Sequence, residues 1–132
     1  MEKIFVDTSG WVALFVKNDK NHKKAVSIFE DIKNSKTPIY TSDYCLDETI
    51  TTIMLRGGHR QSVFAGEALF SSEIIKIVHV SPDYIQSAWE LYQKYKDKEF
   101  SFTDVTSFVI MKDIDIKKSF AFKPGVSDEE FK

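Results

Sequence analysis

The stretch that decides the fold is Lys3-Ile4-Phe5-Val6-Asp7-Thr8-Ser9-Gly10-Trp11. Three apolar residues with high strand propensity end at a carboxylate, and small hydroxyl residues and an aromatic residue follow directly. We expect a buried strand that places Asp7 at its C-terminal edge, where a helix begins. Because ligands of open α/β sheets bind at this edge, Asp7 is a candidate functional residue. Further acids at the same edge would indicate a divalent metal that acts on phosphate.

The composition is typical of one folded domain. The chain has 132 residues, of which 42% are hydrophobic and 14% aromatic, and a formal net charge of −2. A chain of this size is expected to fold around a single core. No apolar run approaches the roughly 20 residues that span a bilayer. The N-terminus also lacks the pattern of a secretory signal, so we expect a soluble cytoplasmic protein.

Cysteine and histidine give no sign of catalysis or zinc binding. The single cysteine, Cys45, excludes an internal disulfide and lies in a helical pattern, which predicts a small buried apolar residue. The three histidines are far apart and lack zinc-ligand spacing, so we expect them to be structural or solvated. They are His22, His59 and His79.

Basic residues form three local groups, and the net charge neither indicates nor excludes nucleic-acid binding. Each group is more typical of the solvated face of a helix than of a binding surface. The groups are Lys20 with Lys23 and Lys24, then Arg56 with His59 and Arg60, then Lys94 with Lys96 and Lys98.

Strand and helix patterns alternate along the chain. Strands are expected at 4–6, 39–41, 74–80 and 119–122. Helices are expected at 9–16, 21–33, from the N-cap Ser42 to about Arg56, at 59–71, from Ser81-Pro82-Asp83 onward and from about Ser101 onward. Gly57-Gly58 is expected to end the third helix. This order predicts an α/β fold with a mostly parallel central sheet and helices on both faces.

Apolar residues at helical spacing predict which helix faces point inward. The expected inward sets are Leu46, Ile50, Ile53 and Met54, then Val63, Leu69 and Phe70, then Ile85, Ala88, Trp89 and Tyr92. The β-branched run at 74–80 predicts a buried strand.

Candidate site residues are acids that follow a strand or open a helix within apolar surroundings. Asp7 and Asp104 both meet this description, but each is equally suited to capping a helix N-terminus. Ser101 and Asp104 have capping-box spacing, with Asp in place of the usual Glu or Gln. For the third helix, periodicity does not choose between Asp47 and Glu48.

Three segments in order resemble the successive motifs of a PIN domain, most similar to the compact prokaryotic type found as VapC toxins. They are Val6-Asp7-Thr8-Ser9-Gly10-Trp11, Asp43-Tyr44-Cys45-Leu46-Asp47-Glu48-Thr49 and Ser101-Phe102-Thr103-Asp104. The resemblance covers nearly the whole chain, which predicts one PIN-like domain over residues 1–132 with a polar tail at 124–132.

The resemblance implies a metal-dependent ribonuclease, the toxin of a toxin–antitoxin pair. Acids matching Asp7, Glu48 and Asp104 would meet in one pocket and bind Mg²⁺ or Mn²⁺ directly or through water. Ser9 and Thr103 would orient a carboxylate or a metal-bound water. The implied partners are an RNA substrate, a small antitoxin and a second copy of the chain in a homodimer.

One residue departs from the family pattern. A fourth acid commonly follows the last strand, where this sequence has Lys123. A cation there would repel a second metal ion, so we expect a one-metal site or a weakened nuclease. Asp128, Glu129 or Glu130 could substitute, although such a run is more typical of a solvated tail.

Two alternatives stay open. A PIN fold without catalysis would serve as an RNA-binding or partner-binding module, which Lys123 favours and the intact trio of acids opposes. Lys123-Pro124 is also similar to the Lys-Pro of receiver domains, but residues 50–57, ITTIMLRG, contain no aspartate to accept phosphate.

Overall fold

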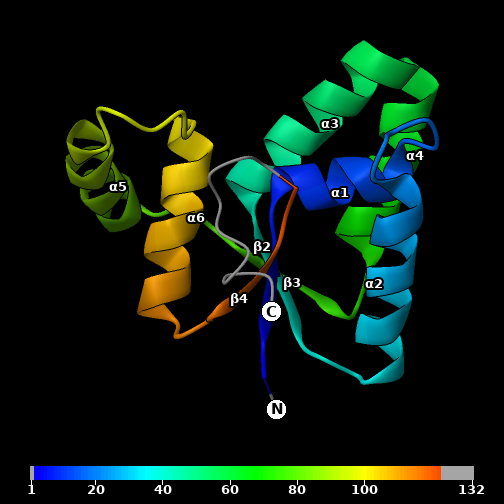
Figure 1. Ribbon diagram of the computed structural model, residues 1–132, viewed down its shortest axis with the longest axis horizontal. Helices are drawn as coiled ribbons and strands as arrows, with labels where there is room; N and C mark the ends of the chain where they lie inside the picture. Colours follow the sequence, from blue (N-terminus) through cyan, green and yellow to red (C-terminus); the bar gives the residue numbers. More distant parts are fainter. Residues whose placement is uncertain (1, 123–132) are drawn as a thin grey trace.

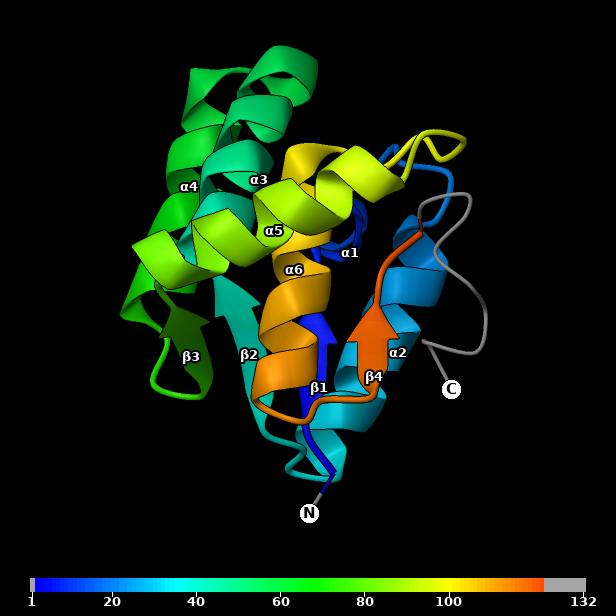
Figure 2. The same ribbon diagram turned by 90° about the vertical axis from the view of Figure 1, so that its left-hand side faces the viewer.

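The computed structural model describes residues 2–122, and its centre is a sheet of four parallel strands. The strands are β1 (Ile4–Val6), β2 (Ile39–Ser42), β3 (Ile75–Val78) and β4 (Lys118–Phe120), in the order β3-β2-β1-β4. Ile4 pairs with Ile39 of β2 and with Lys118 of β4, so β1 is interior to the sheet. Figure 2 shows all four arrows pointing the same way, which puts their C-terminal ends at one edge.

In residues 2–122 six helices surround this sheet, and most begin and end within a residue or two of the expected positions. They are α1 (Thr8–Phe15), α2 (His22–Asn34), α3 (Asp43–Gly57), α4 (His59–Ser71), α5 (Pro82–Lys94) and α6 (Phe102–Asp113). Gly58 ends α3 with φ of 94°, a conformation that favours glycine. Figure 1 shows α5 and α6 on one side of the sheet and α1 and α2 on the other. The predicted α/β fold with helices on both faces is confirmed.

Alternation along β1 builds a core on each face of the sheet. Phe5 packs with residues of α6 and its C-terminal loop, such as Ile110 and Ile116. Ile4 and Val6 point to the other face, where Trp11 of α1 belongs to the same cluster. All three residues of β1 are buried, as expected.

The expectation of a buried strand at 74–80 is wrong. β3 is shorter, and its residues are half-buried or exposed. It lies at the end of the strand order, so it has a neighbour on one side only. An edge strand keeps the β-branched composition while part of its surface faces solvent.

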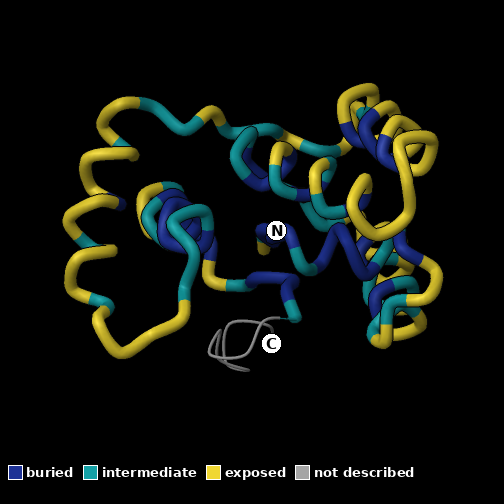
Figure 3. The backbone as a smooth tube through the Cα atoms, turned by 90° about the horizontal axis from the view of Figure 1, so that it is seen from above, coloured by how far each residue is buried: buried dark blue, intermediate teal, exposed yellow. Residues whose placement is uncertain are grey.

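The expected inward faces of α4 and α5 are also partly wrong. Val63 and Phe70 are 42% and 61% exposed, because α4 packs through smaller residues, namely Ser62, Ala65 and Gly66, together with Leu69. In α5 only Ala88 is buried, whereas Trp89 is 51% exposed. Figure 3 shows α5 as the mostly exposed helix at the left. Met54 of α3 is likewise exposed.

Within residues 2–122, the structure contains no helix with both the length and the apolar character needed to cross a bilayer. Lys123 and the predicted tail at 124–132 lie outside the described residues, as do the acids at 128–130.

Candidate active site

Asp7 lies where β1 ends and α1 begins, at the C-terminal edge of the sheet. Its backbone carbonyl accepts hydrogen bonds from the N–H groups of Gly10 (3.0 Å) and Trp11 (3.2 Å), so its main chain starts the helix. Its side chain makes no capping hydrogen bond and is 4% exposed. The interpretation of the Asp7 side chain as a cap of α1 is therefore wrong. Other contacts must account for its burial.

Two side chains from distant parts of the sequence contact the Asp7 carboxylate. Cys45 of α3 donates its S–H to Oδ1 of Asp7 (3.2 Å), and Ser107 of α6 donates its O–H to the same oxygen (3.5 Å). Cys45 and Ser107 also contact each other, with Sγ 3.3 Å from Oγ. Both side chains are almost fully buried. They connect β1, α3 and α6 at a single point.

The chemistry of Cys45 follows from these surroundings. Burial raises the pKa of its thiol well above the usual range, and the negative charge of Asp7 raises it further. The group therefore stays a neutral thiol and acts as a hydrogen-bond donor rather than a nucleophile. The expectation of a buried cysteine is confirmed. Its polar role toward Asp7 was not predicted.

Asp104 combines burial with a capping role. It is fully buried at the start of α6 and forms the capping box predicted from the sequence. The Ser101 hydroxyl accepts a hydrogen bond from the Asp104 N–H (3.0 Å), and Oδ2 of Asp104 accepts one from the Ser101 N–H (2.9 Å). This capping box fixes where the carboxylate lies relative to the helix axis.

The predicted supporting residues have different surroundings. The Ser9 hydroxyl accepts a hydrogen bond from the Phe122 N–H (2.7 Å), which ties the start of α1 to the chain after β4. Thr103 contributes its backbone carbonyl, which accepts a hydrogen bond from Ser107 (3.2 Å). Thr103 thus holds a residue that contacts Asp7, whereas an orienting role for its own hydroxyl stays a prediction.

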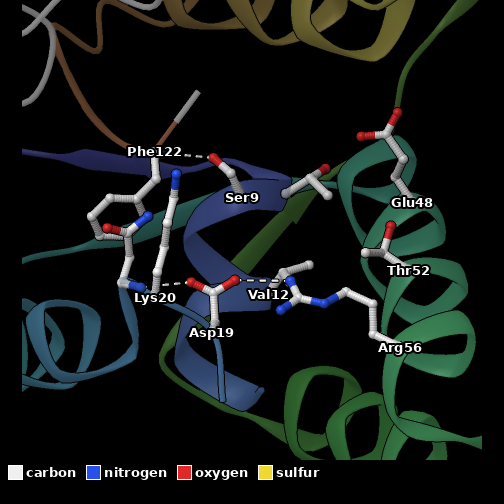
Figure 4. A pocket seen from close by; sticks show the side chains of 10 residues that line it. Ser9, Val12, Asp19, Lys20, Glu48, Thr52, Arg56 and Phe122 are labelled. Atoms are coloured by element: carbon white, nitrogen blue, oxygen red, sulfur yellow. Dashed lines mark hydrogen bonds and ion pairs between the residues drawn. The ribbon is translucent and has the colours of Figure 1, made fainter. Parts of the chain in front are cut away.

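Glu48 is distinguished from Asp47 by its position on α3. Asp47 is exposed, whereas Glu48 is half-buried and lines an open cavity of about 480 Å³. Thr8 and Ser9, the two residues after Asp7, line the same cavity. Figure 4 shows Glu48 and Ser9 at its rim. The structure therefore favours Glu48 as the candidate from α3.

Glu48 and Asp104 lie on the two helices that supply the Asp7 contacts Cys45 and Ser107. Glu48 lies three residues after Cys45 on α3, and Asp104 lies three residues before Ser107 on α6. Residues three apart lie on the same side of a helix. Since Cys45 and Ser107 both contact Asp7, each of the other two acids is within about one helical turn of an Asp7 contact.

This donor set suits a hard divalent cation. All three side chains offer carboxylate oxygens, and two of them are buried. Within residues 2–122, no group of three or more His, Cys, Asp or Glu side chains is close enough to hold a metal ion. Mg²⁺ is commonly held by one or two carboxylates together with water and substrate phosphate. Asp7 and Asp104 offer buried carboxylates of the kind that this arrangement uses, and Glu48 offers a further one at the open cavity.

The opposite wall of the cavity is formed by the loop between α1 and α2. Asp19, Lys20 and Asn21 line it, and Arg56 reaches it from α3. Nη1 of Arg56 lies 2.8 Å from Oδ2 of Asp19. Burial raises the pKa of Asp19, but the hydrogen bonds from Arg56 and from the Asn21 N–H outweigh this effect and lower it. Asp19 therefore stays ionised beside Arg56.

The three histidines make structural contacts or are exposed to solvent, as expected. His22 contacts the Ala13 carbonyl through Nδ1 (2.9 Å), and His79 contacts Asp43 (3.3 Å) at the start of α3. His59 is exposed at the start of α4. The interpretation of the histidines as structural or solvated is confirmed for these residues.

Comparisons with known proteins agree with this architecture. A model of the PIN domain matches residues 4–118. The 23S rRNA-specific endonuclease VapC20 of Mycobacterium tuberculosis is 38% identical over 129 residues, covering 97% of this chain and 95% of that protein. The crystal structure of the same organism's VapC20, described as a Sarcin-Ricin loop cleaving toxin, superposes with a TM-score of 0.86 at 35% identity. That match covers 98% of this chain and 97% of the other. The chain belongs to the PIN domain family.

Proposed function

We propose that this chain is a metal-dependent endoribonuclease, the toxin of a VapBC-type pair, and that Asp7, Glu48 and Asp104 form its catalytic centre. The observation that carries this proposal is the burial of two carboxylates, Asp7 at the end of β1 and Asp104 at the start of α6. Ser107 of α6 contacts Asp7 and donates to the carbonyl of Thr103, the residue before Asp104. Buried carboxylates are expensive to desolvate, so a fold that gathers them is more typical of a binding site than of a structural core.

The proposed chemistry is hydrolysis of an RNA phosphodiester. Bound Mg²⁺ or Mn²⁺ would neutralise the phosphate and lower the pKa of a water molecule. Asp7 and Asp104 would hold the cation, and Glu48 would orient water from the open side. Cys45 and Ser107 would hold the Asp7 carboxylate in position, as donors around metal ligands generally do. Ser9 and Thr103 would support this arrangement.

The names of the similar proteins support a proposal for the substrate and partners of this chain. VapC20 is named as a 23S rRNA-specific endonuclease and a Sarcin-Ricin loop cleaving toxin. At 38% identity over nearly the full length, we propose a structured ribosomal RNA as the substrate of this chain, a small antitoxin as its partner, a homodimeric state and a cytoplasmic location.

The test is cleavage of a ribosomal RNA fragment by the purified protein with Mg²⁺, Mn²⁺ or a chelator. We expect cleavage with metal and none with the chelator. Asp7→Asn should reduce cleavage by more than the roughly 10- to 100-fold loss typical of groups that only support a ligand. Asp47→Asn is the control, because Asp47 is an exposed acid on α3. Equal cleavage by wild type and Asp7→Asn would refute the proposal.

The same assay tests the role of Lys123. We propose that lysine at this position limits the protein to one metal ion or to weak activity. Lys123→Asp should then raise the cleavage rate and change its dependence on metal concentration. Equal, robust activity in both proteins would contradict this expectation.

A further inference from the structure

The cavity beside the acids contains cations from two of the basic groups that the sequence analysis assigned to solvated helix faces. Lys20 comes from the first group and Arg56 from the second, and both line the cavity with Glu48. The remaining basic residues of those groups are not among its lining residues. Lys20, Arg56 and the residues Lys23, Lys24 and Arg60 are all exposed, so their place relative to the cavity, and not burial, distinguishes them. In the folded protein, one cation from each of these two groups therefore lines the same cavity as Glu48.

The cavity has an acidic end and a basic end along one helix. Glu48, Thr52 and Arg56 are spaced by four residues on α3, so they form one stripe facing the cavity. At 1.5 Å per residue, the stripe extends roughly 12 Å along the helix axis. Figure 4 shows the three side chains in this order, with Lys20 across the cavity.

The Arg56 side chain is exposed but is fixed at the cavity by an ion pair with Asp19. Its Nη1 donates to Oδ2 of Asp19 (2.8 Å), and the Asn21 N–H donates to Oδ1 of Asp19 (2.8 Å). A guanidinium carries five N–H donors in a fixed plane, so most of them are still available to an anion in the cavity. An ion pair this exposed contributes little to stability. Stability alone is therefore a weak reason for this arrangement.

The contents of the cavity match a nucleotide unit. Arg56 and Lys20 offer positive charge, Thr52 offers a hydroxyl, and Phe122 offers an aromatic ring on the far wall. Cations bind backbone phosphates and aromatic rings stack on bases in proteins that bind single strands. The volume of about 480 Å³ is in the range of small-ligand sites.

We propose that Arg56, with Lys20 and Thr52, binds a phosphate of the RNA strand next to the phosphate that meets the acids. This inference rests on the proposed function, since it names a second contact for the same substrate. Asp19 is a positioning residue in this scheme, because it acts through Arg56. The subsite sets the register of the strand and thereby determines which phosphodiester reaches Asp7, Glu48 and Asp104.

The experiment is RNA binding without divalent metal, so that cleavage does not interfere. A short fluorescein-labelled single-stranded RNA is titrated with protein at several salt concentrations and followed by anisotropy. Each lost phosphate contact should lower the slope of log Kd against log salt by about 0.7. We expect this reduction for Arg56→Gln and for Lys20→Gln. The matched controls Arg60→Gln and Lys24→Gln should leave the slope unchanged, and Arg56→Lys should largely retain it.

A double variant distinguishes the loss of the attraction between Arg56 and the RNA phosphate from a repulsion by Asp19 once Arg56 is removed. Arg56→Gln leaves Asp19 without its cation, which would itself repel RNA. We therefore expect Asp19→Asn/Arg56→Gln to keep the reduced slope. A slope restored to the wild-type value, equal slopes for Arg56→Gln and Arg60→Gln, or no RNA binding by the wild type would each overturn the subsite.

The two proposals fail in different ways. Wild-type cleavage with an Arg56→Gln slope equal to that of Arg60→Gln would leave the nuclease standing and remove the subsite. A reduced slope in a protein that never cleaves RNA would support the subsite and remove the nuclease.

Discussion

The candidate site has a buried half and an open half, and they are built differently. The buried half comprises Asp7 and Asp104 with Cys45 and Ser107, all almost fully enclosed. The open half is the cavity with Glu48 and Arg56 on its α3 wall. Charge in the buried half is compensated by hydrogen bonds that also join secondary-structure elements, whereas charge in the open half is compensated largely by water. Function and stability should therefore be coupled in the buried half and separable in the open half.

The largest combined effect should come from Asp104→Ala. This change removes a carboxylate from the proposed metal site and the acceptor of the Ser101 N–H in the capping box. We expect cleavage to be lost and the free energy of unfolding to fall by about 1–2 kcal/mol, in the range of a lost cap. Cleavage assays and urea denaturation measure the two effects.

Ser101→Ala is the matched control, because it removes the other half of the same capping box. It should lower stability by about 1 kcal/mol while leaving cleavage close to wild type under conditions where both proteins are folded. If Ser101→Ala abolishes cleavage as completely as Asp104→Ala, the loss comes from the helix start rather than from the acid.

Glu48→Gln should give the cleanest separation of function from stability. The carboxylate is half-buried at the wall of an open cavity, and within residues 2–122 Glu48 belongs to neither a helix cap nor a core cluster. We expect cleavage to fall about 100-fold or more, with the midpoint of thermal unfolding unchanged within the error of calorimetry. An unfolding midpoint lowered as far as that of Asp104→Ala would show that the two halves are not distinct.

Much of this architecture was predictable because the signals are local. The apolar run before Asp7 predicts β1, Gly57-Gly58 predicts the end of α3, and the spacing of Ser101 and Asp104 predicts the capping box; the structure contains all three. Each of these features depends on residues within one turn of each other, so no tertiary information is needed to expect them.

The features that escaped prediction depend on distant partners. The polar role of Cys45 requires Asp7, 38 positions away, and Ser107, 62 positions away. Periodicity could not choose between Asp47 and Glu48, because the choice is made by where α1 lies against α3. The inward face of α4 was assigned to larger residues, but α4 buries Ser62, Ala65 and Gly66 together with Leu69 where it packs against α3. Tertiary packing determines which side chain contacts Asp7, which acid of α3 faces the cavity and which face of α4 is buried. The residue pattern of a single helix carries no information about that packing.

The smallest expected effect is the contribution of Cys45, in the buried half, to the pH dependence of the free energy of unfolding. Burial and the charge of Asp7 raise the pKa of this thiol in the folded protein, whereas an unfolded thiol titrates near about 8.5. The unfolded chain therefore loses its proton first as the pH rises, so the stabilising preference for the neutral thiol is intact below that value and is lost above it. We expect wild-type stability to fall by up to about 1.4 kcal/mol per pH unit above pH ~8.5 relative to Cys45→Ser, whose hydroxyl does not titrate.

Cys45→Ser and Cys45→Ala together test what the thiol does for Asp7. Serine keeps a donor toward Oδ1 of Asp7 and alanine does not. Denaturation of all three proteins under reducing conditions between neutral and alkaline pH isolates the titration, and cleavage at neutral pH isolates the positioning of Asp7. Activity retained by the serine variant and reduced in the alanine variant would tie the hydrogen bond to function. Equal activity in both would mean that the Cys45 hydrogen bond is not needed to hold the carboxylate, and the coupling expected for the buried half would then be confined to Asp104.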